Sequence, residues 1–178
     1  KEKGFAVQTL SSDTAASVAA SGTWTAGGTL NTSNHTQAGG SGTSTAALIF
    51  GGEGPPSISP RFLATTEEYN GTSFTEKNDL NSARTMLGGA GTTTATIAAG
   101  GTSPPSPNSA LTESWNGSSW TEVGDLTVGN KVFGMAGTAT AAFEVGGNNA
   151  ATSYVATHEQ WNGSAWTESG DINTARNW

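Results

Sequence analysis

The stretch ESWNGSSWTE, residues 113–122, decides the fold because close copies of it lie before and after it in the chain. The earlier copy is EEYNGTSFTE at residues 67–76, and the later copy is EQWNGSAWTE at residues 159–168. Successive copies begin 46 residues apart, at positions 67, 113 and 159. A period of about 40–50 residues with strand-like content is typical of proteins in which each repeat forms one small β-sheet. The sequence therefore predicts a repeat protein.

Two further markers run in phase with this motif. A pair of glycines precedes each copy, at Gly51-Gly52, Gly100-Gly101 and Gly146-Gly147. An aspartate followed by Leu or Ile comes after each copy, at Asp79, Asp125 and Asp171. Because three sets of markers share one phase, the repeating unit extends well beyond the ten-residue motif.

The period between Asp79 and Asn116 predicts four short strands, at residues 85–90, 94–99, 110–115 and 119–122. Asn116-Gly117 predicts a two-residue type I′ hairpin between the third and fourth strands, because both residue types tolerate a positive φ. No apolar stripe of helical period and useful length is present, and the prolines cluster outside the apolar segments. The predicted fold class is all-β, with four antiparallel strands in each period.

The composition excludes several classes of function. The net charge is −7, and seven Lys and Arg residues form no basic stripe, so we expect no nucleic-acid partner. No apolar run approaches membrane-spanning length, so we expect no membrane insertion. The absence of cysteine excludes disulfides, thiolate metal ligands and a cysteine nucleophile.

The pattern resembles the kelch repeat, a family of β-propellers whose markers are a double glycine, a Tyr, a Trp and an Arg in the connector to the next blade. The matching residues are Gly51, Gly52, Tyr69, Phe74 and Arg84, then Gly100, Gly101, Trp115, Trp120 and Asn130, then Gly146, Gly147, Trp161, Trp166 and Arg176. Trp replaces Tyr twice, Phe replaces Trp once, and Asn130 replaces the arginine. The resemblance implies a propeller of four-stranded antiparallel blades, and these markers are structural ones.

On this pattern the chain is one repeat domain with about three and a half blades. We expect a degenerate half blade at residues 1–30, blades at 31–76, 77–122 and 123–168, and a connector to a next blade at 169–178. Propellers close with about 4–8 blades. The remaining blades would come either from further copies of the chain or from further segments of a longer polypeptide.

Several recurring residues have both a chemical and a structural explanation. The recurring aromatics would either stack on sugars or pack between blades, and packing is the expectation because one aromatic is needed at each blade interface. The double glycines lack the Gly-Lys-Ser/Thr of a phosphate loop, and close backbone approach explains them. The aspartates recur once per blade, so we expect them to fix connectors through backbone amides or through Arg84 and Arg176. We therefore expect no metal site, no cofactor and no catalytic residues, and the chain is predicted not to be an enzyme.

The segment EQWNGSAWTESGDINTAR, residues 159–176, is similar to repeats in virion proteins of tailed phages, notably marine ones. That resemblance implies a tail-fibre, baseplate or decoration protein at the virion surface or in the extracellular space. Its partners would be other virion proteins and a host-surface glycan or protein. A bacterial secreted or surface adhesin that binds carbohydrate is the alternative. Loops on a rigid scaffold would make the contacts, and the candidate loop residues are Pro55, Pro56, Ser103, Pro104, Pro105, Asn148 and Asn149.

Overall fold

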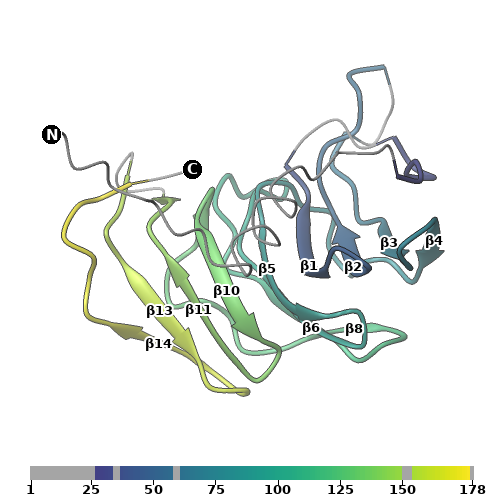
Figure 1. The fold of residues 1–178 in the computed structure, drawn as a ribbon. Helices are drawn as coiled ribbons and strands as arrows, with labels where there is room; N and C mark the ends of the chain where they lie inside the picture. The colour runs from purple at the N-terminus through teal and green to yellow at the C-terminus, as the bar shows by residue number, and fades with distance from the viewer. Residues whose placement is uncertain (1–26, 34–36, 58–60, 150–153, 177–178) are drawn as a thin grey trace, which may run out of the picture.

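A computed structural model describes residues 27–33, 37–57, 61–149 and 154–176 of the chain. These residues contain 14 β-strands and no helix, which confirms the all-β prediction (Figure 1). Accordingly, the described part holds no helix that is long and apolar enough to cross a membrane. The half blade expected at residues 1–30 lies almost entirely outside the described residues.

Twelve of the strands form three antiparallel sheets of four strands each, which we call the first, second and third sheets. The first sheet contains β1 (Gly39–Thr43), β2 (Ala46–Phe50), β3 (Thr66–Tyr69) and β4 (Phe74–Lys77). The second contains β5 (Gly88–Thr92), β6 (Ala95–Ala99), β7 (Thr112–Trp115) and β8 (Trp120–Glu122). The third contains β10 (Gly134–Thr138), β11 (Ala141–Val145), β13 (His158–Trp161) and β14 (Trp166–Ser169). In each sheet the strands lie side by side in the order in which they occur along the chain.

Four antiparallel strands per period were predicted, but the first strand of the second sheet begins three residues later than expected. Thr85 forms an isolated bridge with Thr102, and Met86 has a φ of 59°, which interrupts an extended strand before Gly88. Gly91, predicted to lie in the turn, lies within β5 opposite Thr96, with a φ of 133°. The turn is therefore formed by Thr93 and Thr94.

The type I′ hairpin predicted at Asn116-Gly117 is wrong. Trp115 pairs with Trp120, so four residues connect β7 and β8. Only Gly117 of the dipeptide has a positive φ, 94°. The Asn116 side chain instead accepts hydrogen bonds from the amides of Ser118 and Ser119, both at 2.9 Å. This local capping by the asparagine side chain explains the recurrent Asn-Gly.

The three sheets follow one another along an arc (Figure 1). Their first strands lie side by side, with β5 between β1 and β10. Glycine allows this close approach, since a Cβ on Gly89 would lie 2.5 Å from Phe50 Cζ and 2.8 Å from Gly40 O. A small two-stranded sheet of β9 (Asn130–Lys131) and β12 (Asn148–Asn149), which the sequence did not predict, adjoins the third sheet.

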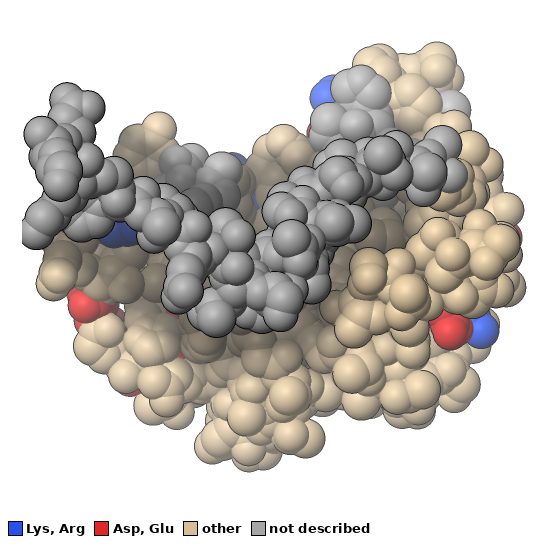
Figure 2. Space-filling model, in the orientation of Figure 1, with Lys and Arg blue, Asp and Glu red and all other residues tan. Residues whose placement is uncertain are grey.

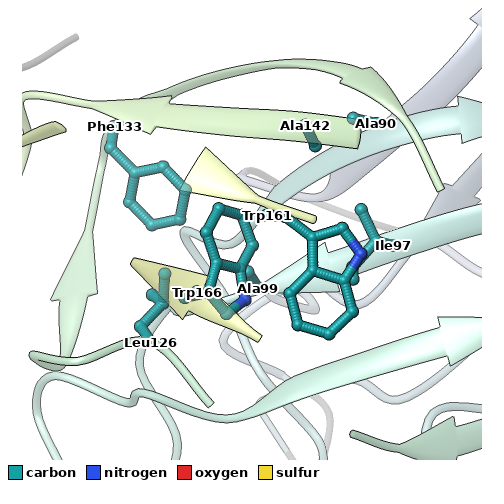
Figure 3. Packing of buried hydrophobic residues seen from close by; sticks show 8 residues of the cluster. All are labelled: Ala90, Ile97, Ala99, Leu126, Phe133, Ala142, Trp161 and Trp166. Atoms are coloured by element: carbon teal, nitrogen blue, oxygen red, sulfur yellow. The ribbon is translucent and has the colours of Figure 1, made fainter. Parts of the chain in front are cut away.

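The hydrophobic core is divided between the two junctions of neighbouring sheets. At the junction of the second and third sheets, Trp166 packs in one cluster with Ile97 and Ala99 of the second sheet and with Phe133, which directly precedes β10 (Figure 3). At the junction of the first and second sheets, Trp120 packs with Leu48 and Phe50. Trp120 and Trp166 are each 5% exposed, which confirms that both are buried between neighbouring sheets.

Candidate functional site

Each junction is held by an indole that crosses from one sheet to the preceding one. Trp120 Nε1 donates to Thr66 Oγ1 at 2.9 Å, and Trp166 Nε1 donates to Thr112 Oγ1 at 3.0 Å. Both contacts are buried. The two tryptophans therefore have structural roles, and their rings do not present a surface for stacking on sugars.

The other aromatic markers lie directly opposite these positions in the register of the third and fourth strands. Ring centroids are 4.7 Å apart for Tyr69 and Phe74, 5.3 Å apart for Trp115 and Trp120, and 5.5 Å apart for Trp161 and Trp166. The glycine markers also share one conformation: they follow the second strand of their sheets with φ values between 64° and 101°. The glycine and aromatic markers thus occupy equivalent places in all three sheets.

The candidate loop residues lie between the second and third strands of their sheets. Pro56, Pro104 and Pro105 are exposed, whereas Pro55, Ser103, Asn148 and Asn149 are half-buried. The second and third loops are joined, because Asn108 Nδ2 donates to Asn148 O at 2.7 Å. The first loop is braced by an ion pair between Arg61 and Glu53. All three loops therefore occupy the same position in their sheets, after the second strand and its glycine pair.

Charged groups are sparse on the molecular face shown in Figure 2, where Lys, Arg, Asp and Glu are scattered among other residues. The described residues include no cluster of three or more His, Asp or Glu side chains that could hold a metal ion. Several charged side chains of the described part are instead buried, among them Glu67, Arg84, Glu113, Glu144 and Glu159.

A buried glutamate at the start of each motif accepts hydrogen bonds from backbone amides. The sequence analysis did not predict this role. Glu67 accepts hydrogen bonds from the backbone amides of Asn31 and Thr32 at 2.8 and 2.7 Å. Glu113 accepts one from Asn81 N at 2.8 Å, and Glu159 accepts one from Thr127 N at 2.9 Å. Each glutamate therefore fixes the connector that leads into its own sheet. Its signal was visible as the first residue of every motif.

The aspartates act as expected on backbone amides but not on arginine. Asp79 Oδ1 accepts a hydrogen bond from Thr66 N at 3.3 Å, and Asp125 Oδ1 accepts one from Thr112 N at 3.0 Å. Arg84 pairs with Glu113 instead, at 3.0 Å between Nη2 and Oε1. Of the two kinds of partner expected for the aspartates, Asp79 and Asp125 therefore use the backbone amides.

Arg84 forms a buried network in the second sheet. Its Nη1 donates to Gly100 O at 3.0 Å and to Leu111 O at 2.6 Å, and the residue is fully buried. Burial lowers the pKa of the Arg84 guanidinium, while the nearby Glu113 carboxylate opposes this change. The ion pair supplies the charge compensation that a buried arginine requires.

In the third sheet, different residues occupy the positions of this buried network. Asn130 replaces the arginine, and its Nδ2 donates to Gly146 O at 2.7 Å and to Glu144 Oε2 at 3.1 Å. Glu144 lies opposite Glu159 in the register, where the second sheet has Ala98 opposite Glu113. Glu144 and Glu159 are 1% and 3% exposed. Burial, reinforced by the Glu159 charge and opposed by the Asn130 hydrogen bond, raises the pKa of Glu144 to about 8.

Because its pKa is raised in the folded state, Glu144 should make the free energy of unfolding fall as the pH rises. Its folded-state pKa of about 8 lies above the ordinary value of 4.5, so the stabilising effect is complete below pH 4.5 and is lost as the pH rises to about 8. We expect Glu144→Gln to be more stable than the parent chain at pH 9, by roughly 2–4 kcal/mol, and to match it at acidic pH. Urea unfolding of both proteins across this pH range tests the prediction. Parallel pH profiles would contradict it.

A cavity of about 580 Å³ lies on the face of the third sheet that is turned away from the second sheet, which we call its outward face. It is lined by Ala141, Ala142, Phe143, Val145, His158, Gln160, Trp161 and Ile172. Sequence reasoning did not identify this cavity.

The comparisons with known proteins leave the family of the chain open. No protein-family model matches it, and no curated protein matches its sequence.

Proposed function

We propose that the three sheets are consecutive blades of a kelch-type β-propeller that serves as a non-catalytic structural and binding module. The equivalent places of the glycine, aromatic and glutamate markers in the three sheets support this architecture. The indoles that join neighbouring sheets support it as well, because successive blades of a propeller must pack face to face.

The function that we propose is display of loops at the surface of a phage particle, in a tail fibre, baseplate or decoration protein. The observation that carries the display role is the position of the loops after the glycine pairs. They present exposed prolines at 56, 104 and 105 on sheets in which the Arg84 and Asn130 side chains donate to backbone carbonyl oxygens. A rigid scaffold with exposed connecting loops is a common arrangement for binding. The assignment to a virion rests on the resemblance of the repeat sequence.

The virion role predicts that the protein is present in purified particles at a fixed ratio to the major structural proteins. Quantitative mass spectrometry of gradient-purified particles measures that ratio. A secreted bacterial adhesin would instead be found free or attached to cells, and would bind glycans as an isolated domain. Absence from particles together with glycan binding would therefore replace the virion role by the adhesin role.

The display role predicts that the loop between the second and third strands of a sheet, and not the hairpin between its third and fourth strands, controls adsorption to the host. Replacing residues 103–107 by Gly and Ser should reduce particle adsorption by about tenfold, the effect of losing ~1.4 kcal/mol of binding free energy. The matched control replaces Ser118 and Ser119, in the hairpin at the other end of the third strand, by Gly. Equal adsorption of the two variants would argue against this loop as the binding element.

A further inference from the structure

The outward face of the third sheet is open where the corresponding face of each other sheet is covered. The covered positions are Leu48 on β2 and Ile97 on β6, both fully buried. The equivalent residue on β11 is Phe143, which is 42% exposed and borders the cavity of about 580 Å³. The first sheet is covered by Trp120 of the second, and the second is covered by Trp166 of the third. The open face therefore continues a series of equivalent interfaces within the molecule.

The connector after the third sheet is held in the same conformation as those that lead into another sheet. Ile172 N donates to Ala156 O at 2.9 Å, as Leu126 N donates to Ala110 O at 3.0 Å. Gly147 N donates to Arg176 O at 2.7 Å, the same length as the bond from Gly52 N to Arg84 O. The backbone of the connector is thus already in place for a following sheet.

The Arg176 side chain, in contrast, differs from its counterpart Arg84. Arg84 is fully buried and pairs with Glu113 of the sheet that follows it. Arg176 is exposed, and among the described residues its side chain donates a single long hydrogen bond, from Nε to Thr174 O at 3.4 Å. The connector therefore presents a guanidinium at the place where the equivalent arginine binds a glutamate carried on a strand.

The first sheet of a second copy does not fit this site as well. In the second sheet, Glu113 binds the backbone and the arginine of one and the same connector, at Asn81 and Arg84. In the first sheet, Glu67 already binds the backbone of its own connector, at Asn31 and Thr32, so that connector occupies the place that the Arg176 connector would need. Its fourth strand begins with Phe74, whose side chain has no N–H to donate to His158 in the way that Trp120 Nε1 donates to Thr66. The cavity also suits a sugar poorly, because apolar side chains supply most of its lining.

We propose that the open face of the third sheet, together with Arg176, is the docking site for another four-stranded sheet of the same repeat. That sheet carries a glutamate at the position of Glu113, which pairs with Arg176, and a tryptophan at the position of Trp120, which fills the cavity beside His158. The imidazole of His158 offers a ring nitrogen as the acceptor for the indole N–H, in place of the threonine hydroxyl of the other junctions. This inference rests on the proposed repeat architecture and not on the virion role.

The test extends the full chain beyond Trp178 by a copy of residues 87–130, so that residues 177–178 stand where 85–86 precede the second sheet. The chain has no cysteine, so Phe143→Cys introduces a unique thiol on the open face. We expect the thiol to react at least about tenfold more slowly with a labelling reagent in the extended chain, because labelling would then require opening of the junction. Val128→Cys, at a connector residue that is 51% exposed, is the matched control and should label equally fast with and without the extension.

Glu113→Ala or Trp120→Ala within the appended copy should restore fast labelling, since each removes one of the two contacts that define the site. Near-ultraviolet circular dichroism reports whether the appended sheet folds, and an extension by residues 133–176 provides a second sheet for the same assay. The proposal is overturned if labelling is unchanged with both extensions, or if both stay unfolded on a folded parent chain. It is also overturned if the unextended chain already protects the thiol by forming dimers, detected by light scattering. Absence of the protein from virions would leave all of these results unaffected.

Discussion

Trp120→Ala is expected to lower the free energy of unfolding by about 3–5 kcal/mol, the usual cost of truncating a large buried aromatic side chain. The ring is 5% exposed and lies edge-to-face with Phe50 at a centroid distance of 4.9 Å. Its N–H also donates to Thr66 Oγ1, so the truncation leaves a cavity and an unpaired hydroxyl at the junction of two sheets. Denaturant unfolding followed by circular dichroism measures the change.

Phe74→Ala provides the matched control for this prediction. Phe74 occupies the same repeat position in the first sheet, but it is half-buried and its ring contact is with Tyr69 of the same sheet. Its truncation should cost about 1–2 kcal/mol, because less surface is buried there. Equal losses in the two variants would show that the stability does not come from the junction between the sheets.

Arg84→Asn is expected to destabilise the second sheet by about 3–5 kcal/mol, because it leaves the buried Glu113 carboxylate without its cation. It also removes the donors to the carbonyl oxygens of Gly100 and Leu111. Thermal and denaturant unfolding at pH 6 and pH 9 give the magnitude. A loss below about 1 kcal/mol would show that the ion pair is dispensable.

The third sheet suggests a second variant that distinguishes the loss of charge pairing from the loss of packing. Adding Ala98→Glu to Arg84→Asn recreates the arrangement of Asn130, Glu144 and Glu159 in the second sheet. The double variant should regain about 1–3 kcal/mol at pH 6, where the new carboxyl is protonated, and lose that gain at pH 9. A recovery that does not depend on pH would indicate that filled volume alone compensates for the arginine.

The sequence by itself determined the all-β class, the four strands per period and the burial of Trp120 and Trp166. These features follow from local rules: short apolar segments between turn residues favour strands, and an aromatic that recurs at each repeat packs at a recurring interface. Local patterns did not specify where the strands end. The first strand of the second sheet is displaced because Thr85 pairs with Thr102, 17 positions later, and Met86 takes a positive φ.

Only the tertiary structure decided which charged groups meet. Arg84 binds Glu113 across 29 residues, and Glu144 lies opposite Glu159 because of the register between β11 and β13. The sequence showed every one of these residues, but the energy of a buried charge depends on which neighbours exclude water and supply hydrogen bonds. The same reason separates Arg84 from Arg176. The two arginines lie in similar connectors, yet Arg84 is buried and paired with Glu113 of the sheet that follows it, whereas Arg176 is exposed beside an open face.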